Sequence, residues 1–235
     1  MSRTFLQIDP VTKRNVGKLV ERATRRGATW SDIDLSDKDF PLTIFPPPNG
    51  GKMRRIIMNS KAYLTQKLIH RPSHIAIACK AGIWDPTSVQ IVAALAEKTD
   101  LEIRFVGDLD ATDLVIFLSA TLMFARWGIP LHYGGINDHW IKTCERKFIR
   151  NDWAKEWESI VAIDIGKNER QMVQDIFKAC PEIRGLLGPK SVAILLKGTK
   201  VELEGTWNAA LYGPDFELSW SRLFYGARFQ NKPPK

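Results

Sequence analysis

Two aspartates separated by a single residue, Asp108 and Asp110, lie between two apolar runs in LEIRFVGDLDATDLVIFLSATLMFA, residues 101–125. Carboxylate oxygens suit hard cations, and Mg²⁺ is usually held by one or two carboxylates together with substrate phosphates. The pair therefore predicts a Mg²⁺ site that acts on phosphate groups, with Asp108 and Asp110 as metal ligands and catalytic residues. Aspartate is also common in turns and at helix N-termini, so a purely structural interpretation stays open.

The elements that must position this pair are a strand and a helix. Residues 101–106 form a short apolar β-run, Gly107 permits a turn, and residues 114–124 predict an apolar helix capped by Thr112 or Asp113. In open α/β sheets, ligands bind outside the carboxyl ends of the strands. The aspartates are thus expected at the crevice where substrates bind.

The surrounding pattern alternates between strands and helices. HIAIAC (74–79) predicts a buried strand, a helix starts at Asp85-Pro86 and runs through Glu97, and PLHYG (130–134) predicts a third strand. Asn137 or Asp138 is expected to cap a helix running toward Phe148. This order predicts an α/β fold with a mainly parallel sheet and right-handed crossovers.

The C-terminal third continues with elements of mixed type. SIVAIDI (159–165) is compatible with a strand or with part of a helix, and residues 168–179 predict a helix. SVAILLKG (191–198) predicts another buried strand, and TKVELEGTW (199–207) alternates like an edge strand. The tail FQNKPPK is expected to be flexible.

The net charge of +8 is concentrated at the N-terminus. Residues 1–72 contain 14 Lys or Arg and 6 Asp or Glu, whereas residues 73–235 contain 20 of each. Residues 10–27 predict a basic amphipathic helix ending at Gly27, and the loop FPPPNGG (45–51) predicts a turn or linker. We therefore expect a basic N-terminal region, 1–72, followed by an α/β domain with a C-terminal extension, 73–235.

These basic residues are candidates for contacts with a nucleic-acid backbone. An alternative is that they only keep helix faces solvated. The candidate set is Lys13, Arg14, Lys18, Arg22, Arg25, Arg26, Lys52, Arg54, Arg55 and, beyond the N-terminal region, Lys80.

Size and cysteine usage narrow the class of protein further. The chain has 235 residues, enough for a real core, and its longest apolar run is too short to span a bilayer. Its three cysteines, at 79, 144 and 180, are widely spaced and lack a CxxC motif, so we expect buried thiols rather than disulfides or a zinc site. A protein without membrane contact, cytoplasmic or associated with the nucleoid, is the expectation.

The strand, the GDxD turn, the apolar helix and the strand ending in YGG (133–135) together resemble the Toprim domain. The resemblance covers about residues 73–140. It is nearest to the type IIB topoisomerase A subunit and the related meiotic double-strand-break proteins, and to bacterial Toprim proteins of DNA defence. It implies a Toprim/Rossmann-like three-layer sandwich with Asp108 and Asp110 as ligands of Mg²⁺.

Two departures from the family concern its chemistry. Toprim domains normally end their first strand with a catalytic glutamate, whereas HIAIAC ends in Cys79-Lys80. Lys80 is expected either to neutralise a phosphate or to pair with Asp108, and Asp85 to be a helix cap. The topoisomerases cut DNA with an upstream tyrosine, and Tyr63 is the matching but poorly spaced candidate nucleophile, with packing as its alternative role.

Three hypotheses follow from these features. The first is a Toprim-like enzyme that carries out Mg²⁺-dependent phosphodiester chemistry on DNA, of topoisomerase or nuclease type. The second is a catalytically degenerate Toprim-like subunit that binds DNA or helps to assemble a larger complex with other protein subunits. The third is a DxD transferase that uses a nucleotide-sugar, in which the basic N-terminus has no evident role.

Overall fold

The computed structural model describes residues 4–25, 41–60, 73–97, 101–142 and 162–203. Its central element is a five-stranded sheet in the order β1-β3-β2-β4-β5. The strands are β1 (Thr43–Phe45), β2 (Arg55–Asn59), β3 (Ile75–Cys79), β4 (Glu102–Val106) and β5 (Leu131–Tyr133). Only β1 runs antiparallel to its neighbour, so the predicted α/β fold with a mainly parallel sheet is confirmed.

The sheet begins earlier in the chain than the sequence indicated. β2 lies between β3 and β4, and all five of its residues are buried. Strands β1 and β2 therefore come from the region that we expected to precede the α/β domain. The apolar run that starts at Ile56 indicates a strand followed by a helix, but so short a run does not reveal that the strand lies at the centre of the sheet.

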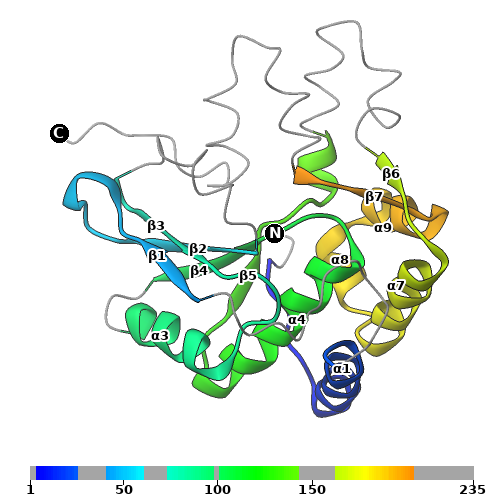
Figure 1. The fold of residues 1–235 in the computed structure, drawn as a ribbon, viewed down its shortest axis with the longest axis horizontal. Helices are drawn as coiled ribbons and strands as arrows, with labels where there is room; N and C mark the ends of the chain where they lie inside the picture. Colours follow the sequence, from blue (N-terminus) through cyan, green and yellow to red (C-terminus); the bar gives the residue numbers. More distant parts are fainter. Residues whose placement is uncertain (1–3, 26–40, 61–72, 98–100, 143–161, 204–235) are drawn as a thin grey trace, which may run out of the picture.

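Two helices cover one face of this sheet, as Figure 1 shows below the strands. These are α3 (Pro86–Glu97) and α4 (Ala111–Phe124), and they contact each other. α3 connects β3 to β4 and α4 connects β4 to β5, so both connections move in the same direction along the sheet and lie on the same face. The Toprim-like three-layer arrangement stays a prediction, because the connection between β2 and β3 lies outside the described residues.

The helix α1 (Pro10–Ala23) packs on the outer side of α4. Asp9 caps it by accepting hydrogen bonds from the N–H groups of Val11 and Thr12, at 2.6 and 3.0 Å. Its buried residues, Thr12, Val16, Leu19 and Ala23, recur at helical spacing. The predicted amphipathic helix is confirmed, although it ends at Ala23 rather than at Gly27, which lies outside the described residues.

The C-terminal third adds a two-stranded sheet and three helices beside α1 and α4 (Figure 1). The strands β6 and β7 are antiparallel, and α7 contacts α1, α4 and α9. These elements are β6 (Ala162–Asp164), α7 (Lys167–Ala179), α8 (Ile183–Leu187), α9 (Pro189–Lys197) and β7 (Thr199–Val201). The structure also contains two short 3-10 helices, η1 (Pro48–Gly50) and η2 (Ala125–Trp127).

The prediction of a buried strand at SVAILLKG was wrong, because this segment is the helix α9. Pro189 occupies its first turn, and Gly198 ends it in the left-handed conformation at φ 88°. Its buried residues, Ser191, Ile194 and Leu195, follow helical spacing, whereas Leu196 is 55% exposed. A short apolar run does not by itself distinguish a strand from a helix.

Candidate functional site

The GDLD turn, residues 107–110, lies at the carboxyl end of β4, where α4 begins. The strand next to β4 is β2, and Asn59 at its end is paired in register with Val106. The Asn59 side-chain amide donates a hydrogen bond to the Val106 carbonyl at 2.9 Å. The strand end beside the turn therefore supplies an amide, whereas β3, the strand at whose end the Toprim resemblance implies a glutamate, is not next to β4.

The first turn of α4 is built on the aspartates themselves. The helix starts at Ala111, and its cap is Asp110, whose carboxylate accepts the Asp113 N–H at 2.7 Å. The predicted caps, Thr112 and Asp113, were wrong by two or three residues because a DxD turn offers several capping carboxylates in succession. Asp110 is therefore the N-cap of α4.

The Asp113 side chain stabilises the GDLD turn through hydrogen bonds. Its carboxylate accepts the Asp108 N–H and the Ser60 hydroxyl, both at 2.7 Å. A Cβ at Gly107 would lie 2.7 Å from an Asp113 oxygen, so this close approach requires glycine. The side chain is 3% exposed, which makes Asp113 a buried structural carboxylate.

A segment from the end of the described chain covers the turn. Residues 199–203, which we call the strap, form an isolated antiparallel bridge in which Leu109 and Val201 exchange two backbone hydrogen bonds, at 2.9 and 3.2 Å. The Leu203 N–H then donates to the Asp108 carboxylate at 2.8 Å. Asp108 is 1% exposed as a result, and Asp110 is 8% exposed.

The electrostatics of the turn reflect this burial. Desolvation, followed by the nearby charges of Asp113 and Asp108, raises the pKa of Asp110 well above its ordinary value. Burial and the same carboxylates also raise the pKa of Tyr133. The Lys200 pKa is raised as well, because its hydrogen bond with Glu202 and the charge of Asp110 outweigh the effect of burial. The GDLD turn is therefore a place where negative charge is costly.

The residues of this turn do not fit Mg²⁺ in the arrangement that the structure shows. Mg²⁺ demands near-octahedral geometry and usually keeps several of its waters. Here the Asp108 carboxylate accepts a strap N–H, and Asp110 caps a helix. Within the described part of the chain, no group of three or more His, Cys, Asp or Glu side chains is placed to hold a metal ion. Metal binding by Asp108 and Asp110 stays a prediction.

Other residues that were predicted near the carboxyl ends of the strands bind to groups close to them in the structure. Lys80 is buried and lies 3.8 Å from Asp85 rather than beside Asp108, because β2 separates the strand that it follows from β4. Asp85 caps α3, as predicted, by accepting the Ser88 N–H at 2.9 Å. Of the two predicted helix caps that follow β5, Asn137 accepts the Trp140 N–H at 3.1 Å, whereas Asp138 accepts the Ser191 N–H at the start of α9.

The basic residues of α1 face solvent, on the side of the helix opposite its buried residues. This exposed set, the α1 cations, comprises Lys13, Arg14, Lys18 and Arg22 of the helix and Arg25, two residues after its end. Glu21 is the single acidic residue of the helix. Arg22 forms an ion pair with Asp175 of α7. The remaining predicted residue of this cluster, Arg26, lies outside the described residues.

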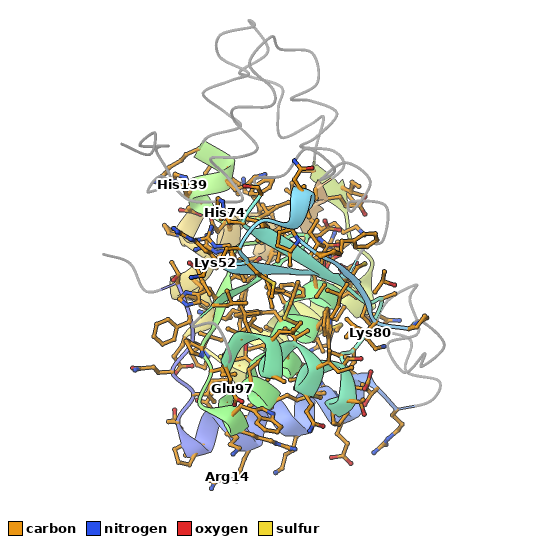
Figure 2. The ribbon with its side chains drawn as sticks, turned by 90° about the vertical axis from the view of Figure 1, so that its left-hand side faces the viewer. Arg14, Lys52, His74, Lys80, Glu97 and His139 are labelled. Atoms are coloured by element: carbon orange, nitrogen blue, oxygen red, sulfur yellow. The ribbon has the colours of Figure 1, made fainter. Side chains whose placement is uncertain are left out.

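The second predicted basic cluster does not lie on the same surface as the α1 cations. Lys52 and Arg54 are exposed just before β2, at the opposite end of the parallel strands from the GDLD turn. Figure 2 shows Lys52 far from Arg14 and at the opposite end of the strands from Lys80. The two predicted basic clusters therefore form separate surfaces.

Arg55 is not available to a nucleic-acid backbone. Its guanidinium is buried and lies 2.6 Å from the Glu102 carboxylate, which also accepts Arg104. Burial alone would raise the pKa of Glu102, but the charges of Arg104 and Arg55 lower it. The prediction for Arg55 fails because a charge inside a sheet needs a buried partner. Tyr63 lies outside the described residues, so its role stays a prediction.

The comparisons with known proteins assign no family: no protein-family model matches the chain, and no curated protein is similar to it in sequence. None of the described helices is long and apolar enough to cross a membrane.

Proposed function

We propose that this protein is a catalytically degenerate Toprim-like subunit that binds DNA, and that α1 is its contact with the phosphate backbone. The exposed α1 cations carry this proposal. Arg14 and Lys18 lie one turn apart on the solvent side of the helix, Arg25 follows its end, and the buried side anchors the helix to α4. A rigid row of cations is suited to neutralising successive phosphates.

The GDLD turn supports the degenerate form of the proposal. Its aspartates accept hydrogen bonds from backbone N–H groups, and the neighbouring strand β2 ends in Asn59. A metal-dependent nuclease needs open coordination positions for water and substrate. Here those positions would have to be made by moving the strap.

Mg²⁺-dependent phosphodiester chemistry is the second candidate, and one observation favours it. Three buried carboxylates lie close together here, and burial, followed by their mutual repulsion, raises the pKa of Asp110. A divalent cation would relieve that repulsion. The nucleotide-sugar transferase hypothesis would use the same carboxylates and leaves the α1 cations without a role.

The decisive experiment measures binding and cleavage in parallel. Duplex binding is followed by fluorescence anisotropy at two salt concentrations, for the wild type, for Arg14→Glu/Lys18→Glu and for the control Lys52→Glu. Each phosphate contact contributes about 0.9 to the slope of log affinity against log salt. We expect the double variant to bind at least about tenfold more weakly, with a shallower slope, and the control to bind like the wild type.

Cleavage is followed as nicking of supercoiled plasmid with Mg²⁺ or Mn²⁺, for the wild type, Asp108→Ala and Asp110→Ala. Salt-dependent binding without nicking is the expected result. Nicking that both variants abolish would replace the proposal with the metal-dependent enzyme. Neither binding nor nicking would overturn both, and nucleotide-sugar transfer would then be assayed.

A further inference from the structure

A second helix presents a polar row beside the α1 cations. On α7, Lys167, Gln171, Gln174 and Lys178 are exposed and recur at i, i+4, i+7 and i+11, which places them on one side of the helix. We call this set the α7 row. Its opposite side, Met172, Val173, Ile176 and Phe177, is buried. The row has a lysine at each end, and the two glutamines between them provide amide N–H donors.

The two helices are neighbours and their polar sides are joined. α1 contacts α7, and the two lie side by side in Figure 1. The ion pair between Arg22 and Asp175 bridges them, and Asp175 is one turn before Lys178. Gln171 donates a hydrogen bond to the same carboxylate at 3.2 Å. Asp175 is thus occupied from both helices, and its charge is compensated at the seam.

The chemistry of this surface selects a duplex over a single strand. Proteins that hold single strands stack the bases on aromatic side chains. The sequence of α1 contains no aromatic residue, and the aromatic residue of α7, Phe177, is 2% exposed. Lysine, arginine and glutamine donors without aromatics suit the phosphates of a backbone whose bases stay stacked.

The dimensions agree with a short stretch of duplex. The span from Arg14 to Arg22 corresponds to about 12 Å of helix, and the span from Lys167 to Lys178 corresponds to about 16 Å. Packed helices lie about 8–10 Å apart. Such a surface covers about half of a duplex turn, since one turn of B-DNA is about 34 Å long.

We infer that α1 and α7 form one binding surface for the phosphate backbone of double-stranded DNA, and that the α7 row contributes contacts of its own. The inference rests on the proposed function and specifies its ligand. Binding through phosphates carries no base-edge readout, so the surface holds duplexes of different sequence equally.

The test compares one substitution on two helices. Gln174→Glu adds a charge to the α7 row, and Gln90→Glu adds the same charge to the exposed side of α3, which Figure 1 shows on the far side of α4 from α7. Lys178→Ala removes one cation, and Lys52→Ala is its control. Affinity is measured by anisotropy on a short labelled duplex, over a salt series.

We expect Gln174→Glu to weaken duplex binding several-fold and Lys178→Ala to lower the salt slope by about 0.9, with both controls unchanged. An unlabelled single strand of the same length should compete less well than the duplex. Variants of α7 that bind like their controls, while Arg14→Glu/Lys18→Glu still weakens binding, would overturn this inference alone. Stronger competition by the single strand would also overturn it. A wild type that binds no DNA would instead overturn the proposed function.

Discussion

The GDLD turn and the α1–α7 surface contain charged residues that differ in what surrounds them. Asp108, Asp110 and Asp113 are buried and accept hydrogen bonds from the protein itself. Lys18, Arg25 and Lys178 are exposed to solvent. Residues that look most like a catalytic motif in the sequence are thus used to hold the fold, and the plainer basic helix is open to a partner.

The difference shows why a motif alone is weak evidence for catalysis. A DxD turn that starts a helix has two uses for its oxygens, because free N–H groups and cations both attract carboxylates. Backbone N–H groups of the strap and of α4 donate to one oxygen of Asp108 and one oxygen of Asp110. Surface cations contribute less to the fold, because an exposed ion pair such as Arg22–Asp175 stabilises it by only about 0–1 kcal/mol.

Replacing Asp113 with alanine should have the largest effect on stability. The substitution leaves the buried Asp108 N–H and the Ser60 hydroxyl without their acceptor. Hydrogen bonds to charged groups contribute about 1.5–3 kcal/mol each, so we expect a loss of about 3 kcal/mol in the free energy of unfolding. Urea denaturation measures this, and Asp113→Asn, which keeps one acceptor oxygen, should lose less. A loss below about 1 kcal/mol for Asp113→Ala would contradict the structural role of this carboxylate.

Asp108→Ala should have a smaller and more local effect. It removes the acceptor of the Leu203 N–H, and we expect a loss of about 1.5 kcal/mol. The amides of Val201 and Leu203 should then exchange with deuterium faster, because the strap opens more often. Exchange on α1 serves as the internal control. Unchanged exchange of the strap would show that Asp108 does not hold it.

Much of this architecture is readable from local sequence. The strand, turn and helix around residues 101–124 follow from an apolar run, a glycine and a capping carboxylate that are all close together. The amphipathic spacing of Val16 and Leu19 predicts α1 in the same way. Local patterns of this kind are strong because each residue's neighbours are fixed by the chain.

The closure of the turn was not predictable from local sequence. The contact between Asp108 and the Leu203 N–H joins residues 95 positions apart, and that between Ser60 and Asp113 joins residues 53 apart. Asn59 and Ser60 carried a signal, since two polar residues follow the apolar run of β2. Placing them beside the GDLD turn requires the strand order, in which β2 rather than β3 is next to β4.

Asp110→Asn should stabilise the protein at neutral pH. The amide keeps the oxygen that accepts the Asp113 N–H, and asparagine caps helices as well as aspartate does. Burial and the neighbouring carboxylates raise the folded pKa of Asp110 above its unfolded value. The folded state therefore binds a proton more tightly, and stability falls as pH rises from the unfolded pKa through the folded one.

The asparagine variant should lack this loss, so its gain over the wild type is expected to be about 1 kcal/mol or more at pH 7 and to shrink toward pH 4. Urea denaturation across this pH range measures the gain. A ligand that binds only the folded state stabilises it. If millimolar Mg²⁺ stabilised the wild type but not the variant, the turn would therefore be a metal site.

Asp175→Asn should have the smallest effect on stability and the most telling effect on binding. The Arg22–Asp175 pair is half exposed on the arginine side, so its loss should cost less than about 1 kcal/mol. Removing the carboxylate takes a negative charge away from the seam between α1 and α7. Duplex affinity should therefore rise about two- to threefold, because the repulsion between this carboxylate and a nearby phosphate is lost. Asp164→Asn, an exposed aspartate on β6, is the matched control and should leave affinity unchanged. Equal gains for both variants would mean that duplex affinity depends on net charge alone. The α1–α7 surface would then have no special role in binding, although the GDLD turn would still be a structural element.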